Sequence, residues 1–474
     1  MDFPHDIPSA HRAILNEVAQ QSKILGQESY LVGGYVRDFY LDRIKNDVDM
    51  DVVTIGSGIQ LAERVHESFR SKGINSKYSF FKQFGTAQVK TPAIELEFIG
   101  ARKESYREDS RKPLVEDGTL EDDQNRRDFT INALYWSLDL DQMGMLIDPF
   151  GGLSNLNKGI IQTPIDPEKT FSDDPLRMMR AIRFAAQLNF KLHPETLEAI
   201  GKMASRLQIV SKERILVELN KIVACKVPSI GFALLFETGL LKEFFPEMHA
   251  LQGVQERKGL RHKDNFWHTL KVLDNVAEVS DHLWLRWAAI MHDIAKPPTQ
   301  RFEEDHGWTF HGHDALGAKW TPRIFRRLGL PMDERMRYVQ KLVRLHLRPI
   351  ALVSDQVSDS AVRRLIFEAE NDIDDLMTLC RADVTSKNEF KVRRFMRNFE
   401  RVERKIVEVE EKDRIRNWKN PLSGEEIMNA LGIPPSKRIG VIKDHIKEAI
   451  LNGDIPNEHE AAFNYMMAHQ QEWG

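Results

Sequence analysis

The stretch LVGGYVRDFYLDRIKNDVDMDV, residues 31–52, decides the fold of the N-terminal part of the chain. It predicts a strand over 29–34 that ends in a pair of glycines, a helix over 35–43, and a second strand over 47–55. Short β-rich runs that alternate with amphipathic ones are typical of a mixed α/β domain. The stretch therefore predicts an α/β head at the start of the chain.

Acidic side chains repeat along the second of these strands. Asp47 and Asp49 are separated by one residue, so both carboxylates point to the same face, which Asp51 shares. Such carboxylates repel each other unless a cation lies between them, and an oxygen-only pair suits Mg²⁺. Gly33 and Gly34 would let backbone N–H groups approach a polyphosphate. The pattern predicts a metal and nucleotide site, although a DxD pair alone is more often a solvated strand end.

Outward from this stretch, the β signal continues only for a short distance. Runs at 78–90 and 93–100 predict two or three more strands, and the charged, apolar-poor segment 101–127 is typical of a mobile loop. After Asn132 the β signal almost vanishes. From residue 172 onward, helix-period stretches are separated by Pro and Gly, so we expect an extended helical array.

The composition is that of a globular intracellular protein. At 474 residues and roughly 150 residues per domain, about three domains are expected. The formal net charge of -4 means that any site for a polyanion must be local. Cys225 and Cys380 are the two cysteines, and their separation argues against a disulfide framework. We find neither a signal peptide nor an apolar run of about 18 to 20 residues, so we expect a cytoplasmic protein without membrane contact.

Three segments carry a specific family resemblance. LVGGYVRDFYLDRIKNDVDMDV (31–52), RRDFTINALYW (126–136) and DDPLRMMRAIRFAAQLNF (173–190), in this order, resemble the class II tRNA nucleotidyltransferase/poly(A) polymerase family. The resemblance implies a head similar to DNA polymerase beta, a mixed sheet with helices. The resemblance also implies that an elongated all-α array follows this head.

The resemblance also implies a catalytic centre. Asp47 and Asp49 match the pair that binds Mg²⁺, and Glu97 is a candidate third carboxylate, with a surface position on an edge strand as its alternative. A metal clamp of this kind would activate an RNA 3′-hydroxyl and neutralise pyrophosphate. The implied nucleotide-binding set is Gly33, Gly34, Arg37, Arg127, Asp128, Asn132, Asp173, Asp174, Arg177 and Arg180. Arg126 is expected to be a solvated neighbour.

Asp173 and Arg177 suggest how a base could be selected without a template. On a continuous helix they are i and i+4 and share a face. A carboxylate accepts from the exocyclic amine of cytosine or adenine while a guanidinium donates to the adjacent ring nitrogen, and guanine and uracil have the opposite polarity. The alternative is an intrahelical ion pair. The family motif commonly begins with Glu, so the shorter Asp173 leaves its reach open.

A second constellation follows in the helical region. GLRHKDNFWHTLKVLDNV (259–276), AAIMHDIAKPPTQ (288–300), FHGHDALGAKW (310–320) and CRADVTSK (380–387) resemble the HD phosphohydrolase superfamily. An isolated His in a helical bundle is usually a satisfied core or surface residue, but an ordered H…HD…D set favours a divalent transition metal. The pattern falls on His268, His292, Asp293 and Asp383, with His313 and His346 as candidate ligands of a second metal.

These segments divide the chain into four expected parts. The C-terminal segment 423–457 predicts two helices joined by a Pro-rich turn, and it resembles the C-terminal module of bacterial family members. The expected domains are a nucleotidyltransferase head (1–160), a helical base-recognition neck and body (161–258), an HD metal-dependent domain (259–390) and a helical tRNA-binding region (391–474).

The expected activity is addition of CCA to tRNA 3′ ends from CTP and ATP. A poly(A) polymerase, or an enzyme that adds only CC or only A, is the alternative within the family. Family polymerases resemble one another in a basic Gly-Arg-Arg-Phe strand, whereas residues 83–86 here read QFGT. The charged segment 101–127 has the family length, which favours A addition. From a different class, HD phosphohydrolysis could be the main activity. The oligomeric state is left open.

Overall fold

The structure is a computed structural model that describes residues 3, 7–44, 48–82, 85–92, 94–107, 110–261, 263–352, 358–385, 388–413 and 418–473. The chain forms two compact units. The first comprises Met1–Ile222 and Ile230–Phe244, and the second comprises Val223–Ser229 and Phe245–Gly474.

A seven-stranded mixed sheet forms the head, in the order β3-β4-β5-β2-β1-β8-β9. β2 and β5 are parallel, and the other neighbouring pairs are antiparallel. The strands are β1 (Glu28–Val32), β2 (Val48–Ile55), β3 (Lys77–Phe81), β4 (Thr86–Lys90), β5 (Ile94–Gly100), β8 (Tyr135–Ser137) and β9 (Leu146–Ile147). The expected mixed α/β head is confirmed.

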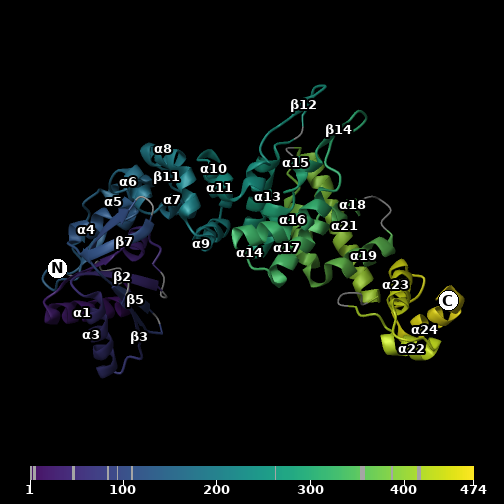
Figure 1. The fold of residues 1–474 in the computed structure, drawn as a ribbon, viewed down its shortest axis with the longest axis horizontal. Helices are drawn as coiled ribbons and strands as arrows, with labels where there is room; N and C mark the ends of the chain where they lie inside the picture. Colours follow the sequence, from purple (N-terminus) through teal and green to yellow (C-terminus); the bar gives the residue numbers. More distant parts are fainter. Residues whose placement is uncertain are drawn as a thin grey trace. The chain divides into compact units, whose positions relative to one another are not determined.

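One face of the sheet is covered by helices α1 (Ser9–Leu25) and α3 (Gly58–Ser71), which contact each other and the strands (Figure 1). Leu61, Val65 and Phe69 of α3 recur every four residues and are buried, as are Leu96 and Phe98 of β5. Since side chains alternate along a strand, the residues between them face the other side of the sheet. That side is left for polar groups.

The segment 101–127 is not the loop expected from its charge. It forms a hairpin of β6 (Arg102–Arg107) and β7 (Ser110–Asp117), followed by helix α4 (Leu120–Asn125). A hairpin is held by backbone hydrogen bonds and needs few apolar side chains, and Arg102 is in register with Asp117. Thr119 and Asp122 form a capping box that starts α4.

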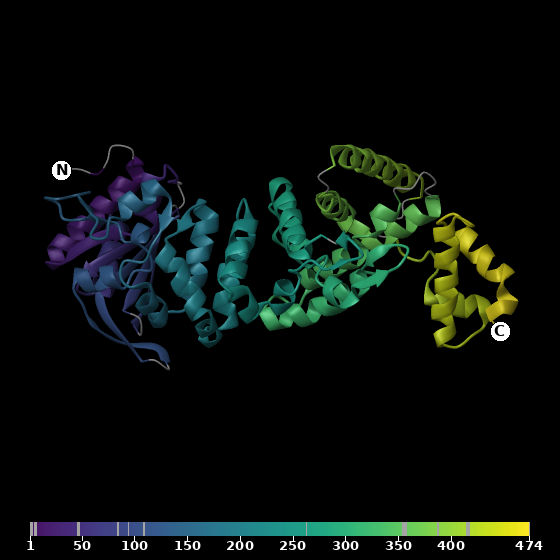
Figure 2. The same ribbon diagram turned by 90° about the horizontal axis from the view of Figure 1, so that it is seen from above.

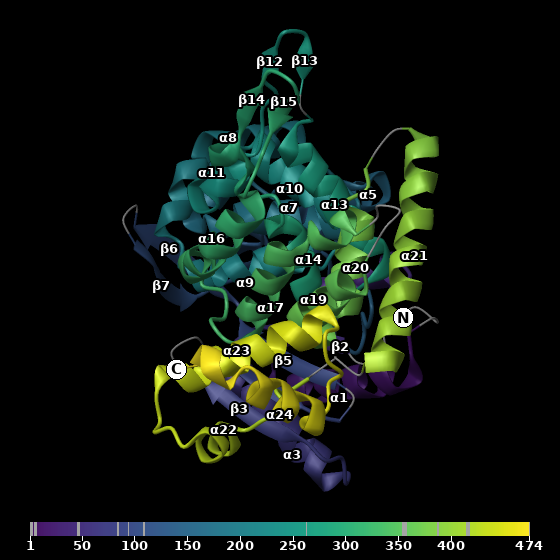
Figure 3. The same cartoon turned by 90° about the vertical axis from the view of Figure 1, so that its right-hand side faces the viewer.

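The β structure also does not end at Asn132, as the sequence suggested. β8 and β9 extend the sheet, but they have only three and two residues, too short to show a period of two. Two short hairpins occur in the second unit, where they lie side by side (Figures 1 and 3). They are β12 (Glu256–Arg257) with β13 (Leu260–Arg261), and β14 (Arg301–Glu303) with β15 (Gly307–Thr309).

The rest of the described chain is largely helical, which confirms the second half of the expected fold. In the first unit the helices are α2 (Gly34–Tyr40), α5 (Gly152–Lys158), α6 (Pro167–Asp173), α7 (Leu176–Leu188), α8 (Pro194–Met203), α9 (Lys212–Val223), α10 (Pro228–Glu237) and α11 (Leu240–Phe244). In the second unit they begin with α12 (Pro246–His249), α13 (Asn265–Val279), α14 (Leu283–Met291), α15 (Lys296–Thr299), α16 (His313–Leu328), α17 (Glu334–Leu345), α18 (Arg348–Ala351), α19 (Asp359–Ala369), α20 (Ile373–Ala382) and α21 (Glu389–Asp413).

The C-terminal helices share a small core of their own. They are α22 (Gly424–Leu431), α23 (Lys437–Asn452) and α24 (His459–Ala468), drawn in yellow in Figure 2. Ile427, Ile442, Ile446 and Met466 are buried in this core. The two helices expected over 423–457 are therefore present. Across the described residues, every helix falls short of the length or apolar character needed to cross a membrane.

Candidate active site

Three carboxylates lie together on the free face of the sheet. The parallel register of β2 and β5 places Asp51 opposite Glu97. Asp49 lies two residues before Asp51 and shares its face, because the alternating residues Met50 and Val52 are fully buried. Asp47, the other expected metal ligand, lies outside the described residues, so its role stays a prediction. Asp51 was noted in the sequence only as a neighbour, and its register with Glu97 makes it a candidate ligand.

Gly33 borders this carboxylate row at the end of β1. Its φ of 81° lies in the left-handed region, and a Cβ there would meet Asp51 Oδ2 at 3.0 Å. A glycine is therefore required both by the backbone conformation and by the approach to Asp51. Gly34 begins α2, so the expected glycine turn between strand and helix is present.

The carboxylate row, Asp49, Asp51 and Glu97, concentrates negative charge at a partly buried position. Burial raises the pKa of Asp51 above its ordinary value; Arg127 opposes this effect and Asp49 adds to it. Burial likewise raises the pKa of Glu97, with Asp51 as the next contributor. A bound cation would stabilise the ionised form of these buried, mutually repelling carboxylates, and an oxygen-only donor set fits Mg²⁺. The residues present therefore fit the metal that the family implies.

A chain of hydrogen bonds joins four of the expected nucleotide-binding residues. Arg37 Nη1 donates to Asn132 Oδ1 at 2.8 Å, and Asn132 Nδ2 donates to Asp128 Oδ1 at 3.0 Å. Arg180 Nε in turn donates to Asp128 Oδ2 at 2.8 Å. Burial alone would raise the pKa of Asp128, but Arg180 and then Asn132 lower it to about 2. The network fixes side chains from α2, from the segment after α4 and from α7.

Arg127, the fifth such residue, is held by an acid that the sequence did not reveal. Its Nη2 donates to Asp123 Oδ2 at 2.8 Å, and Tyr135 Oη donates to the same oxygen at 2.8 Å. Burial opposes ionisation of Asp123, yet Arg127 and then Arg126 lower its pKa to about 2. Arg126 is therefore an ion-pair partner rather than the solvated neighbour expected. The capping box of Thr119 and Asp122 was the one sequence signal that a helix, and hence Asp123, is positioned here.

The base-reading segment differs from its expected geometry. Asp173 ends α6, Asp174 is extended with φ −141° and ψ 102°, and α7 begins only after Pro175. A proline disfavours the helical conformation in the residue before it, which here is Asp174. Asp173 and Arg177 therefore lie on different helices.

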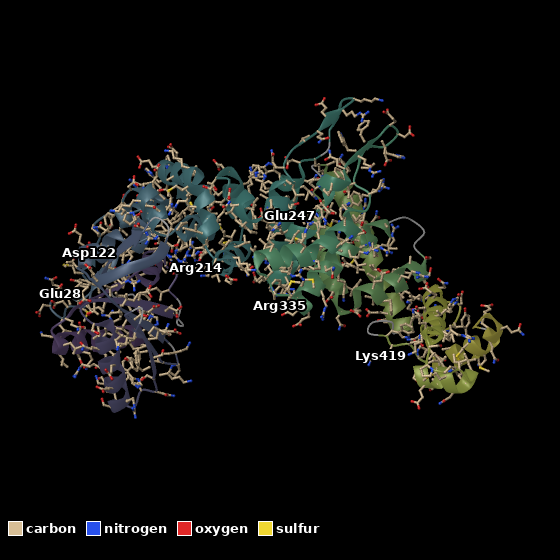
Figure 4. All side chains as sticks on the ribbon, in the orientation of Figure 1. Glu28, Asp122, Arg214, Glu247, Arg335 and Lys419 are labelled. Carbon is tan, nitrogen blue, oxygen red and sulfur yellow. The ribbon has the colours of Figure 1, made fainter. Side chains whose placement is uncertain are left out.

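The break gives Asp174 and Arg177 separate partners. Arg214 Nη2 of α9, labelled in Figure 4, pairs with Asp174 Oδ2 at 2.8 Å, and the sequence reading missed this arginine. Arg177 Nη2 donates to the backbone carbonyl of Arg126 at 2.6 Å. The start of α7 thus contacts the segment that carries Arg127, Asp128 and Asn132.

In the second unit, the four expected HD residues converge. His268 Nε2 lies 2.9 Å from Asp383 Oδ1 and 3.4 Å from Asp293 Oδ2. His292 Nε2 lies 3.2 Å from Asp293 Oδ2. They come from α13, from the end of α14 and from the end of α20, which is how helical proteins assemble a metal site.

The histidines are oriented for a metal by their outer nitrogens. His292 Nδ1 donates to the carbonyl of Ala289 at 2.7 Å, which leaves its buried Nε2 facing Asp293 Oδ2 at 3.2 Å and Asp383 Oδ1 at 3.7 Å. Burial alone would lower the pKa of His292, but Asp293 raises it to about 10. The carboxylates of Asp293 and Asp383 place negative charge beside this nitrogen, and histidine nitrogen with carboxylate oxygen is a donor set that fits a transition metal bound by the neutral imidazole.

Comparison with known proteins gives the same class as the geometry: a nucleotidyltransferase head followed by an HD domain. The Poly A polymerase head domain matches residues 29–162, the probable RNA and SrmB-binding site of polymerase A matches 189–252, and the HD domain matches 265–388. The A-adding tRNA nucleotidyltransferase of Deinococcus radiodurans is 33% identical over 356 residues, 72% of this chain and 78% of that protein. The Multifunctional CCA protein of Nitrosococcus oceani is 35% identical over 312 residues, 64% of this chain and 71% of that protein.

Solved structures agree with this assignment. The Bacillus stearothermophilus CCA-adding enzyme in complex with CTP has a TM-score of 0.63 at 25% identity, covering 98% of each chain. The Thermotoga maritima CCA-adding enzyme complexed with tRNA has the same fold, with a TM-score of 0.60 at 20% identity over 98% of this chain and 97% of that one. The chain belongs to the class II tRNA nucleotidyltransferase and poly(A) polymerase family. It is a tRNA nucleotidyltransferase that carries an HD domain.

Proposed function

We propose that the head adds CCA to tRNA 3′ ends from CTP and ATP. The observation that carries this proposal is the carboxylate row: Asp51 opposite Glu97, with Asp49 beside them and Gly33 against Asp51. A row of acids next to buried arginines suits a reaction in which a metal and a polyphosphate meet.

In this proposal Asp49 and Asp51 hold Mg²⁺, with Glu97 as the third carboxylate. Bound Mg²⁺ would lower the pKa of the RNA 3′-hydroxyl and neutralise charge on the leaving pyrophosphate. Asp47 is the alternative partner of Asp49, as the family resemblance implies. Comparing Asp47→Asn with Asp51→Asn decides between the two pairs.

The nucleotide would be held by residues that the head already fixes in place. Arg127, Asp128 and Asn132 would contact the ribose and phosphates, since they combine donors and acceptors within one network. Base selection would fall to Arg177 with Asp173 or Asp174, because α7 begins against the Arg126 carbonyl and so lies beside the ribose-binding segment. A carboxylate and a guanidinium together accept cytosine and adenine and reject guanine and uracil.

The alternatives within the family are addition of A alone, addition of CC alone, and poly(A) synthesis. Both an A-adding and a multifunctional CCA relative resemble this chain. A hairpin and a capped helix occupy 102–125, the segment that the resemblance links to A addition. We therefore favour full CCA addition.

The experiment uses four tRNA transcripts, which end before CCA, after the first C, after CC and after CCA, each incubated with Mg²⁺ and one labelled nucleotide. Full CCA addition predicts CTP incorporation on the first two ends, ATP incorporation only on the end that already carries CC, and none on complete tRNA. An enzyme that labels only the CC end with ATP is A-adding, and long A tracts on any end mean a poly(A) polymerase. Either result overturns the proposal.

We propose a second function for the HD region, hydrolysis of a phosphoester on a damaged RNA end. The observation that favours it is the convergence of His268, His292, Asp293 and Asp383. In this reaction water adds to phosphorus, the ester P–O bond breaks, and the departing oxygen takes up a proton. Phosphate release from 2′-phosphorylated nucleotides, and ring opening of 2′,3′-cyclic nucleotides to the phosphomonoester, in Mn²⁺, Ni²⁺ or Co²⁺ test it. Equal release by wild type and His292→Ala would contradict it.

Domain division and location complete the proposal. We retain the four parts 1–160, 161–258, 259–390 and 391–474, and we place tRNA contact in the last. The match of the HD domain to residues 265–388 supports the bounds 259–390 of the third part. The two cysteines, Cys225 and Cys380, are buried thiols outside any disulfide, which suits the reducing cytosol.

A further inference from the structure

We infer that the growing 3′ strand of the RNA lies on the free face of strands β3 and β4, where Phe81 stacks on a base and Lys77 contacts a phosphate. This inference rests on the proposed nucleotide addition, because it names the surface that guides the RNA end to the carboxylate row. A cross-link that requires no catalysis separates its failure from the failure of that activity.

The nucleotide-binding residues lie on one side of the carboxylate row. Tyr135 of β8, Val32 of β1 and Asp51 of β2 are in register across three neighbouring strands, so their side chains share one face of the sheet. Arg127 Nε donates to Tyr135 Oη at 3.2 Å. Burial raises the pKa of Asp51, and the charges of Arg127 and Arg180 oppose that rise, so both guanidinium groups lie near the row. We therefore place the polyphosphate of the nucleotide over β1 and β8.

The geometry of phosphoryl transfer then places the RNA on the opposite side of the row. The attacking oxygen approaches phosphorus in line with the leaving group and opposite to it. On that side the sheet continues for two more strands, because Glu97 of β5 is in register with Gln88 of β4, and Gln88 with Ser79 of β3. At about 4.8 Å per strand, β3 lies roughly 10 Å from Glu97, within reach of the nucleotide that precedes the RNA end.

This part of the head carries the positive charge that an RNA strand requires. The sequence between Glu67 and Glu95 contains no acidic residue and five basic ones, Arg70, Lys72, Lys77, Lys82 and Lys90. Because the whole chain has a formal net charge of -4, such a local excess suits contact with a polyanion. Lys77 is exposed on the free face in register with Lys90, whose Nζ pairs with Glu95 at 2.8 Å. Lys77 is therefore the residue that we assign to a phosphate.

Phe81 is an exposed ring on the same polar face. It is 47% exposed, and it shares the face of Ser79 because side chains alternate along β3. The neighbouring Phe80 points to the other face, where it is in register with the buried Ala87 and stacks on Tyr78 with ring centroids 5.8 Å apart. An aromatic ring stacks on any base, which suits a strand whose last bases change with each addition.

The competing explanation treats β3 only as an edge strand. β3 lies at one end of the sheet order (Figure 1), and lysines on an edge strand prevent unwanted pairing with other strands. In that case Lys77 and Phe81 contact no RNA, and their replacement leaves nucleotide addition unchanged.

The first test is a photo-cross-link between tRNA and the full-length wild-type protein. A transcript that ends after the first C carries 4-thiouridine in place of the residue before CCA, and it is irradiated with the protein without CTP or ATP. We expect mass spectrometry to find the cross-linked base on residues 77–90. A cross-link confined to residues 126–180, or none on 77–90, overturns the inference. A cross-link on 77–90 by a protein that adds no nucleotide supports the inference and overturns only the proposed activity.

The second test compares variants of the two adjacent rings in the addition of C to tRNA that ends before CCA. Phe81→Ala should lower kcat/KM for tRNA roughly 5- to 150-fold, the effect of one base stacked on an aromatic ring, while KM for CTP stays within twofold. Phe81→Tyr, which retains a ring, should restore kcat/KM. The matched control Phe80→Ala, whose ring is 54% exposed on the other face, should keep the wild-type values.

The salt dependence of tRNA binding tests Lys77. Loss of one phosphate contact should reduce the slope of log affinity against log salt by about 0.7 in Lys77→Gln, and Lys23→Gln on α1 should keep the wild-type slope. Equal kcat/KM in Phe81→Ala and Phe80→Ala overturns the inference, as does a salt slope that Lys77→Gln and Lys23→Gln share. Circular dichroism checks the fold of each variant, and the cross-link on the wild type decides the inference without them.

Discussion

Asp128 shows how a buried acid in the head is kept ionised. It accepts hydrogen bonds from the Phe129 backbone N–H, from Asn132 and from Arg180. Burial would raise its pKa, yet these groups hold it at about 2, below the ordinary value of roughly 3.9. A carboxyl whose folded pKa is lowered stabilises the fold above its unfolded pKa and loses that contribution as the pH falls through the folded value.

We therefore expect acid to weaken the head through Asp128. A depression of about two pKa units corresponds to roughly 2–3 kcal/mol of unfolding free energy at neutral pH, lost between about pH 5 and pH 2. Asp128→Asn should lower the free energy of unfolding at pH 7 and flatten its dependence on pH in that window. Urea unfolding at a series of pH values measures both. The exposed control Asp141→Asn should keep the wild-type slope, and an unchanged slope in Asp128→Asn would contradict this assignment.

Arg177 is expected to act on nucleotide choice more than on stability. A guanidinium that reads a base edge gives about 1–3 kcal/mol of discrimination, or roughly 5- to 150-fold. The ratio of UTP and GTP incorporation to CTP and ATP incorporation should therefore rise by that factor in Arg177→Ala. The control Arg70→Ala, on the helix-covered side of the sheet, should keep the wild-type ratio. Unchanged selection in Arg177→Ala would show that α7 does not read the base.

At the scale of elements, local patterns predicted some parts of the head and missed others. β1, α2 and β2 follow from the glycine pair and the alternating residues around it. The hairpin over 102–117 was missed because its charged residues carry little apolar period, and backbone pairing holds it. The break before α7 was readable from Pro175, but helical periodicity on both sides concealed it.

The capping box of α4 gives a prediction at this scale. Thr119 starts the helix that presents Asp123 to Arg127, and loss of an N-cap costs about 0.5–2 kcal/mol. Thr119→Ala should accelerate hydrogen exchange of the amides over 120–125 by about 2- to 30-fold. Ser57→Ala, at the cap of α3, should accelerate α3 alone. Equal exchange over 120–125 in both variants would mean that Thr119 does not hold α4.

At the scale of the whole molecule, two units carry two sites of different donor chemistry. The His-Asp doublet and its spaced partners made the HD residues predictable from sequence. Arg214 was not predictable, because its partner Asp174 lies 40 residues away and single charged residues that far apart give no periodic signal. Asp123 was missed for another reason: Arg126 and Arg127 follow it by three and four residues, but its helix lies in a segment that was expected to be a loop.

The metal-ligand atoms of the two sites differ, so we predict that nucleotide addition and phosphoester hydrolysis depend on different metals. After chelation, Mg²⁺ alone should restore nucleotide addition at the oxygen-only row and leave HD phosphoester hydrolysis low. Mn²⁺, Ni²⁺ or Co²⁺ should restore the hydrolysis, because imidazole ligands favour these metals. Assays of both reactions on one chelated preparation measure this, and hydrolysis restored fully by Mg²⁺ would contradict the assignment.

The most direct test of the central claim, that the carboxylate row performs nucleotide addition, is a single-turnover comparison of Asp51→Asn with Glu63→Gln. Glu63 lies on α3, on the other side of the sheet. Loss of several kcal/mol of transition-state stabilisation corresponds to roughly a thousand-fold in rate. We predict that Asp51→Asn loses both CTP and ATP addition to that extent while tRNA binding stays within a few fold, and that Glu63→Gln adds both at the wild-type rate. Addition by Asp51→Asn within tenfold of wild type would contradict the account.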